Sequence, residues 1–134
     1  MGAGKSTIGQ EVASLSGRPF VDLDGEIERR HGPVGELFVR GEPEFRRIEE
    51  AVAAEVLASS TPSVIALGGG AVLSGGTREL LRTDAFTLWV DVDVAAAWKR
   101  VRDTGRPLAQ DEVEFRRLFD ERQPLYEAVS ARLV

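Results

Sequence analysis

The chain has 134 residues, 43% hydrophobic and 29% charged, a composition typical of one soluble globular domain. The absence of cysteine excludes a disulfide framework and a thiolate metal site, and it is consistent with a cytoplasmic protein. The net charge of −5 argues against a nucleic-acid partner, and the apolar runs are far too short to cross a membrane. Most of the 17 basic residues are arginines, so an anionic substrate is expected where several of them converge.

The first residues form the second half of a P-loop pattern. Gly4, Lys5 and Ser6 match the last three positions of G-x-x-x-x-G-K-[ST], in which backbone N–H groups surround phosphate, the lysine reaches its oxygens and the hydroxyl binds Mg²⁺. Apolar residues at positions 8, 12 and 15 predict a helix that ends at Gly17 and directs its N-terminal amides at the same anion. The alternative is a glycine-rich turn that contains Lys-Ser by chance.

The pattern is incomplete at its start. Its first glycine would lie before Met1, as would the buried strand of about five apolar residues that normally precedes a P-loop. We therefore expect the sequence to be a fragment, or its start to be misassigned, with the first strand of the fold missing.

Residues 20–24 are predicted to form a short strand that carries two acids at its end. Residues two apart in a strand point to the same face, so Asp22 and Asp24 are expected to project together from the carboxyl edge of the sheet, where α/β proteins bind ligands. Beside a P-loop, one carboxylate would serve Mg²⁺ and the other a hydroxyl substrate. The alternative is that both are ordinary strand-end and helix-cap acids, since Asp is a common N-cap.

Three helical segments follow this strand. Residues 26–31 end at Gly32-Pro33, residues 34–40 end at Gly41, and a longer helix runs from Glu42-Pro43 to about residue 59 with apolar positions 45, 48, 52 and 56 on one face. Arg46 lies beside this apolar face, near the start of the helix. Most arginines in such places are solvated, so its position alone does not assign it to a site.

The apolar run 64–67 predicts a parallel strand that is buried on both faces. It ends in Gly68-Gly69-Gly70, and three glycines at a strand end let the backbone come very close to a ligand, although a merely flexible loop is the alternative. Many P-loop proteins place an aspartate for the metal at this strand end. None stands here, so Asp22 is expected to carry more of the metal chemistry.

The second half of the chain continues the alternation of strands and helices. We predict a helix at 77–82, a buried strand at 86–90, a helix at 94–103, a loop at 104–108, a helix from 111 to about 123 that stops at Pro124, and a final strand at 131–134. This order indicates an α/β domain with a parallel sheet and right-handed crossovers. A P-loop on such a sheet, in a chain of this size, indicates a small metabolite kinase.

Six segments together resemble the shikimate kinase family: MGAGKST at 1–7, FVDLD at 20–24, FRRIE at 45–49, LGGGA at 67–71, RPL at 106–108 and RQPLY at 122–126. They occur in that family's order and span essentially the whole chain. The resemblance implies one domain, residues 1–134, with a three-layer α/β/α P-loop kinase fold around a central parallel sheet. The strand before the P-loop and the C-terminal helix of that fold are expected to be missing, so the domain is truncated at both ends.

The resemblance also implies the reaction and its nucleotide site. The reaction is ATP-dependent phosphorylation of the 3-hydroxyl of shikimate, a step of aromatic amino-acid biosynthesis. Lys5 would contact the transferring phosphate, Ser6 would bind Mg²⁺, and Asp22 would hold metal-bound water. Arg106 matches an arginine on a lid that closes over the phosphates, and Arg100 is expected beside the adenine. The residues that surround the triphosphate would be Gly2, Ala3, Gly4, Lys5, Ser6 and Thr7.

The implied shikimate site combines arginines, glycines and an acid. Asp24 would bind ring hydroxyls and act as the base, while Arg46 and Arg122 would bind the carboxylate. The remaining residues of this site would be Gly68, Gly69 and Gly70, which meet ring hydroxyls through backbone N–H, and Phe38 and Phe45, which wall the ring.

Two other functions stay open at this stage. One is another small P-loop sugar-acid kinase, such as a gluconate kinase, which the two arginines and the triple glycine suit less well. The other is a nucleotide-binding fragment without turnover, or one piece of a fused pathway enzyme. In each case the expected partners are small molecules, with no nucleic acid and no membrane, and the expected assembly is a monomer.

Overall fold

The computed structural model describes residues 3–105 and 108–133, and within them the chain alternates short strands with helices. The elements in chain order are α1 (Lys5–Ser16), β1 (Phe20–Asp22), α2 (Leu23–His31), α3 (Val34–Arg40), α4 (Glu42–Leu57), β2 (Val64–Ala66), the 3₁₀ turn η1 (Ala71–Leu73), α5 (Gly75–Asp84), β3 (Leu88–Val90), α6 (Val94–Val101), α7 (Glu112–Val129) and β4 (Ala131–Leu133). Several helices begin at side-chain caps, as in α5, where the Ser74 hydroxyl accepts a hydrogen bond from the Thr77 N–H at 3.1 Å.

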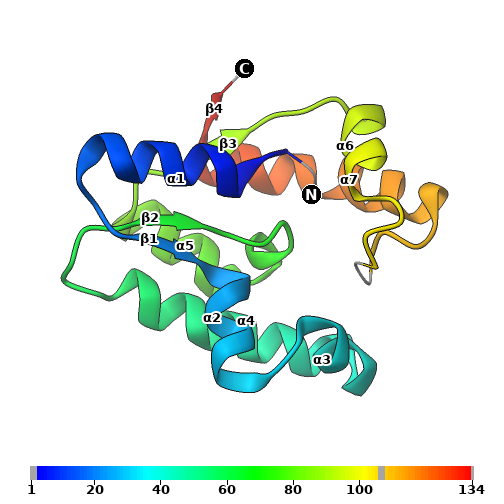
Figure 1. The fold of residues 1–134 in the computed structure, drawn as a ribbon, viewed down its shortest axis with the longest axis horizontal. Helices are drawn as coiled ribbons and strands as arrows, with labels where there is room; N and C mark the ends of the chain where they lie inside the picture. Colours follow the sequence, from blue (N-terminus) through cyan, green and yellow to red (C-terminus); the bar gives the residue numbers. More distant parts are fainter. Residues whose placement is uncertain (1–2, 106–107, 134) are drawn as a thin grey trace.

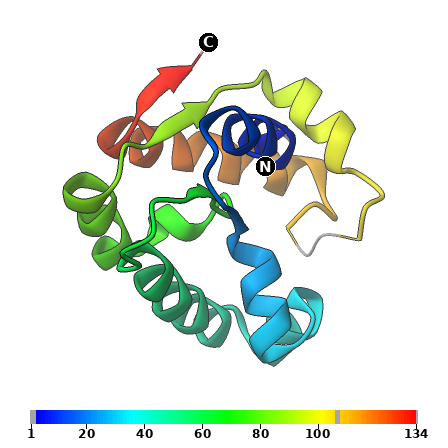
Figure 2. The ribbon, with the colours of Figure 1, turned by 60° about the vertical axis from the view of Figure 1, so that its left-hand side comes forward.

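The strands form two separate parallel pairs. In the first pair β1 lies beside β2, with Phe20 opposite Val64, and in the second pair β3 lies beside β4, with Leu88 opposite Ala131. Figure 2 shows β3 and β4 side by side at the end of the chain. Among the described residues, β2 has no strand partner other than β1, and β3 has none other than β4. Among these residues, β2 and β3 therefore each have one edge without a strand beside it.

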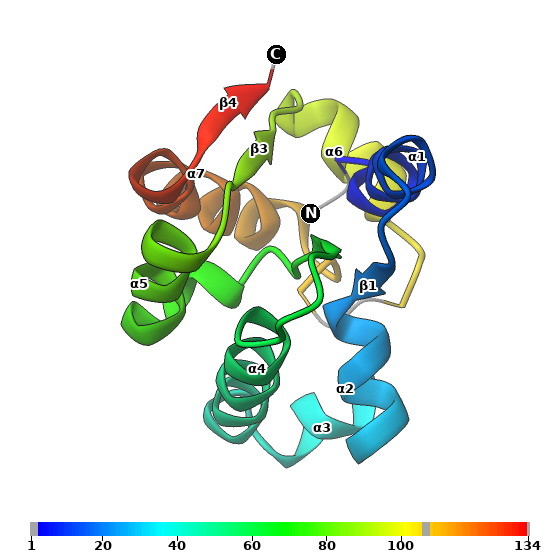
Figure 3. The same cartoon turned by 90° about the vertical axis from the view of Figure 1, so that its left-hand side faces the viewer.

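Helices cover both sides of these strands in three layers. Figure 3 places α1 and α6 on one side and α4, α5 and α7 on the other. The helices α2 and α3 pack with the start of α4 as a separate lobe at the lower end of Figure 1. This arrangement confirms the predicted α/β architecture with parallel strands.

Three predicted boundaries and one predicted burial pattern were wrong. The strand predicted at 20–24 stops at Asp22, because the Asp22 side chain accepts a hydrogen bond from the Asp24 N–H at 3.2 Å and so begins α2. The helix predicted to stop at Pro124 continues to Val129 with the proline inside it. The strand predicted to begin at Phe86 starts at Leu88. The strand predicted to be buried on both faces is only half-buried at Val64 and Ile65.

Buried apolar side chains in the described part of the chain form two clusters. One joins α2, α3 and α4 through residues such as Ile27, Leu37 and Phe45, and the other joins α6 and α7 through Val101 and Phe115. Neither cluster extends across the gap between the two strand pairs. Helices α2, α3 and α4 therefore share one core, and α6 and α7 share another.

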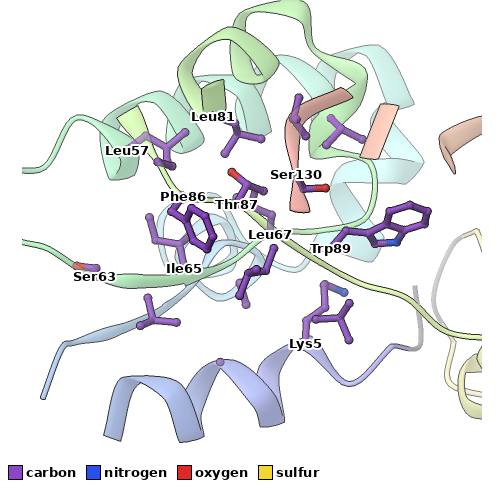
Figure 4. Close-up of a pocket in the computed structure, with 18 of the residues that line it drawn as sticks. Lys5, Leu57, Ser63, Ile65, Leu67, Leu81, Phe86, Thr87, Trp89 and Ser130 are labelled. Carbon is purple, nitrogen blue, oxygen red and sulfur yellow. The ribbon is translucent and has the colours of Figure 1, made fainter. Parts of the chain in front are cut away.

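A cleft of about 640 Å³ lies between the two strand pairs. Figure 4 shows Ile65 and Leu67 from one side of the cleft and Phe86 and Trp89 from the other. Phe86 is 86% exposed and Leu88 is 47% exposed, although both belong to the segment 86–90 that was predicted to form a buried strand. The lining is mainly apolar, so the cleft is the place where the fold lacks packing.

Within residues 3–105 and 108–133, no helix combines the length and the hydrophobicity that a bilayer crossing would require.

Candidate active site

The P-loop residues lie at the N-terminus of α1. Gly4 is the residue before the helix and has φ = 81°, a left-handed conformation that glycine adopts readily and other residues rarely do. Lys5 and Ser6 occupy the first turn, and Lys5, with Ala3, lines the cleft, as Figure 4 shows for Lys5. The exposed backbone amides of this first turn can bind an anion. Of the predicted P-loop residues, Gly2 lies outside the described part of the chain.

The two aspartates lie on different elements. Asp22 is the exposed last residue of β1 and the cap of α2, whereas Asp24 lies in the first turn of that helix and is half-buried. The prediction that both project from one strand face is therefore wrong. A Cβ atom placed on Gly68 would lie 3.1 Å from Asp24 Oδ1, so the Asp24 carboxylate packs directly against the glycine segment after β2.

Arg46 lies on α4 beside the same glycine segment. Its Nη1 atom donates to Glu49 Oε1 at 2.8 Å, and its guanidinium carbon lies 5.6 Å from the ring centroid of Phe38 and 5.2 Å from that of Phe45. A Cβ atom on Gly70 would lie only 2.3 to 2.6 Å from the guanidinium. Arg46 therefore occupies space that any side chain at position 70 would fill.

Glu49 was not predicted to belong to the site. It is 3% exposed, and its Oε2 atom would lie 3.3 Å from a Cβ on Gly68. Burial raises the pKa of the Glu49 carboxyl, the neighbouring Arg46 opposes this effect, and the charges of Asp24 and Arg122 act on it as well. Asp24, Arg46, Glu49 and Arg122 thus form one electrostatic cluster around the glycine segment.

Arg122 is the most unusual member of this cluster. It lies in α7 and is 2% exposed, yet its Nε and Nη2 atoms have no hydrogen-bond partner among the described residues. A buried charge without such partners is unfavourable, so the arrangement is stabilised when an anion accepts these hydrogen bonds. A ligand carboxylate has two oxygens that match a guanidinium fork.

Tyr126 is the last residue of the motif RQPLY, but the sequence did not predict a role for it in the site. Its hydroxyl donates to the Gly69 carbonyl at 2.7 Å, which connects α7 to the glycine segment 57 residues earlier. The ring packs against Trp89 of β3, with ring centroids 5.7 Å apart.

The two arginines predicted to bind the nucleotide are not members of this cluster. Arg100 is exposed in the last turn of α6, and Arg106 lies outside the described residues. The described residues contain no group of three or more histidine, cysteine or acidic side chains that could enclose a metal ion. Ser6 and Asp22 each carry an oxygen ligand of the kind that Mg²⁺ uses, and with a nucleotide that ion needs only one or two protein oxygens beside phosphate and water.

A family model described as shikimate kinase matches residues 1–134. This chain belongs to the shikimate kinase family.

Relatives within the shikimate kinase family cover nearly the whole chain. The shikimate kinase of Corynebacterium efficiens is 45% identical and covers 96% of this chain, which spans 78% of that relative. The shikimate kinase of Thermobifida fusca is 43% identical and covers 99%, and the chain spans 79% of it.

Solved structures of the family agree with the fold. The shikimate kinase of Acinetobacter baumannii, determined in complex with shikimate, matches with a TM-score of 0.94 at 37% identity, over 100% of this chain and 78% of that one. The shikimate kinase of Bacteroides thetaiotaomicron matches with a TM-score of 0.88 at 33% identity, over 99% of this chain and 81% of that one. The P-loop kinase fold and the kinase activity predicted from the sequence are therefore confirmed.

Proposed function

We propose that this protein transfers the γ-phosphoryl group of ATP to the 3-hydroxyl of shikimate. The observation that carries the proposal is the buried Arg122 guanidinium, which has two hydrogen-bond donor atoms without a protein partner and lies in a cluster with Asp24, Arg46 and the glycine segment. This cluster offers positive charge for one carboxylate and an acid for a hydroxyl. Membership of the shikimate kinase family disfavours a gluconate kinase.

The two arginines hold the substrate carboxylate from different helices. Arg122 on α7 offers Nε and Nη2, the pair of atoms that can bind both oxygens of a carboxylate. Arg46 on α4 shares its charge with Glu49 and is held by Phe38 and Phe45, so it is already oriented before substrate binds. Ordering the arginines in advance reduces the entropy lost on binding.

Asp24 is the residue that receives the proton of the reacting hydroxyl. Its carboxylate lies against Gly68, so a ring hydroxyl bound at the glycine segment comes within its reach. As the O–P bond to the 3-oxygen forms, the bond between the γ-phosphorus and the bridging oxygen of ATP breaks, and ADP leaves with the electron pair. Catalysis is then mostly positioning together with neutralisation of phosphate charge.

The nucleotide side uses the first turn of α1. Lys5 neutralises phosphate charge, and the backbone amides after Gly4 orient the phosphates. Ser6, and Asp22 through water, would hold Mg²⁺, which would supply further neutralisation of phosphate charge. Arg106 and Arg100 are proposed to contact the phosphates and the adenine, respectively.

We also propose that an extended segment before Met1 completes the sheet inside the cleft. The cleft is bordered by one open edge of β2 and one open edge of β3, which are both parallel strands, and its walls are apolar. A strand placed there pairs with both edges at once. Assays of turnover therefore use the chain extended by about ten upstream residues, enough for one average strand and the first half of the P-loop.

The direct test of function is ADP release by this extended chain. We expect release that depends on shikimate, with little release on gluconate. Equal release with gluconate, or none with shikimate, contradicts the assignment.

The carboxylate site is tested by replacing Arg46 or Arg122 with alanine. Each change removes charge-assisted hydrogen bonds of about 1.5–3 kcal/mol, which corresponds to roughly ten- to hundred-fold weaker shikimate binding by calorimetry. Lysine at either position should restore only part of the affinity, since an ammonium cannot form the planar fork. Arg116→Ala serves as the control, because this arginine is on α7 but pairs with Glu112 at 3.0 Å.

The methyl ester of shikimate separates this role from general damage. The wild type should bind the ester poorly, and the Arg46 and Arg122 variants should lose little further affinity when shikimate is replaced by the ester. If the variants remain as sensitive to esterification as the wild type, these arginines do not bind the carboxylate.

A further inference from the structure

Tyr126 connects the helix that carries Arg122 to the glycine segment. It follows Arg122 by one turn of α7, and its hydroxyl donates to the Gly69 carbonyl at 2.7 Å. Burial raises the pKa of the Tyr126 hydroxyl, and Arg122 opposes this effect through its charge and a side-chain hydrogen bond. The hydroxyl therefore stays a donor at neutral pH, and the ring is held by Trp89 on the other side.

The glycine segment requires an external anchor. A Cβ on Gly68 would press on Asp24 and Glu49, and a Cβ on Gly70 would displace the Arg46 guanidinium. The same lack of side chains gives the backbone wide conformational freedom, so its peptide groups are not oriented by local sterics alone. A bond from outside the segment is the simplest way to restrict this freedom.

The hydrogen bond to Gly69 also orients the next amide. The peptide group is planar, so fixing the direction of the Gly69 carbonyl fixes the direction of the Gly70 N–H, which points the opposite way. Tyr126 thus determines where that donor is presented. Because Arg122 is on the same helix, one rigid element sets the spacing between the carboxylate site and the glycine segment.

We propose that Tyr126 is a positioning residue that sets the specificity of the site for the ring hydroxyls of its substrate. The proposal rests on the proposed function, since it takes shikimate as the ligand of Arg122. Tyr126 acts through the Gly69–Gly70 peptide and does not itself contact the reacting atoms.

The test is Tyr126→Phe, which removes the hydroxyl and keeps the ring on Trp89. We expect shikimate to bind about 3- to 10-fold more weakly, the effect of one lost hydrogen bond, while the KM for ATP stays within about twofold. Shikimate analogues that lack one ring hydroxyl should reveal the specificity. The variant should lose less affinity than the wild type when the hydroxyl facing the glycine segment is absent.

Ser130→Ala is the matched control. The Ser130 hydroxyl donates to the Tyr126 carbonyl at the end of α7, so this change also removes a hydroxyl-to-carbonyl bond from the same helix without involving the glycine segment. It should lower the melting temperature without changing shikimate selectivity. The proposal is overturned if Tyr126→Phe weakens ATP and shikimate equally, or if its selectivity among the deoxy analogues equals that of the wild type.

Calorimetry is run beside the kinase assay to separate the two proposals. A wild type that binds shikimate without turnover contradicts the proposed function, yet the comparison with Tyr126→Phe still decides the role of Tyr126. A wild type that turns over shikimate with the same specificity as the variant contradicts only the positioning role. A wild type that does not bind shikimate overturns both.

Discussion

Adding an upstream strand should convert a weakly folded chain into a stable one. Phe86, Leu88 and Val12 line the cleft and are 86%, 47% and 42% exposed, so together they leave nearly two side chains' worth of apolar surface in water. At about 1.5–3 kcal/mol for each fully buried side chain, covering this wall contributes about 3–6 kcal/mol before the strand's own side chains are counted. The whole stability of a domain is only about 5–15 kcal/mol.

The 134-residue chain alone should therefore be molten or insoluble, with weak ATP binding, because its open strand edges can also pair with other molecules. The chain extended by about ten residues, five of them consecutive apolar strand formers, should show one cooperative thermal transition and sharp near-ultraviolet circular dichroism. A control extension of equal length made of glycine and serine should not restore it. The reasoning is refuted if the 134-residue chain melts sharply, is stabilised by ATP, and gains nothing from the apolar extension.

Four further substitutions probe the site in the extended chain. Asp24→Asn should abolish most turnover while leaving Mg²⁺-ATP binding nearly intact, and Asp22→Asn should raise the Mg²⁺ needed for activity; a loss of nucleotide affinity in Asp24→Asn would exchange the roles. Because burial raises the pKa of Glu49 in the folded state, the stability that this carboxyl contributes at low pH is lost as the pH rises through that pKa. The free energy of unfolding in urea should therefore become larger for Glu49→Gln than for the wild type as the pH rises. A difference between the two that is independent of pH contradicts this. Gly70→Ala should raise the KM for shikimate more than that for ATP, since the added Cβ displaces the Arg46 guanidinium; equal changes in both would count against it.

The alternation of elements could be predicted from the sequence because it depends on local signals. Apolar runs, glycines after helices and capping residues placed most helices and strands within a few residues. Local competition between signals caused the errors. The Asp22 side chain begins a helix two residues earlier than the strand pattern suggested, and α7 passes through Pro124. A proline there costs one backbone hydrogen bond, which the burial of Phe115 and Arg122 in the preceding turns of α7 can offset.

The site residues that the sequence did not reveal are those defined by long-range contacts. Glu49 and Tyr126 are the last residues of the motifs FRRIE and RQPLY, so both lie in segments that the sequence analysis singled out. The neighbouring sequence, however, does not indicate that Glu49 contacts Gly68 or that Tyr126 contacts Gly69. Asp24, Arg46 and the glycines were predicted as site residues through the family resemblance. The structure brings them together with Arg122, although their individual roles remain predictions.

The buried guanidinium of Arg122 has a consequence for how such an enzyme can evolve. A charged group that is 2% exposed and lacks partners on two of its nitrogens lowers the stability of the free protein, and an apolar residue of similar volume would raise it. Selection for thermal robustness alone would therefore remove Arg122, whereas selection for growth would keep it. The loss can be offset only elsewhere in the molecule. Lineages of this family that adapt to heat should accumulate stabilising changes in the lobes, such as the contacts among α2, α3 and α4, and leave this unfavourable charge in place.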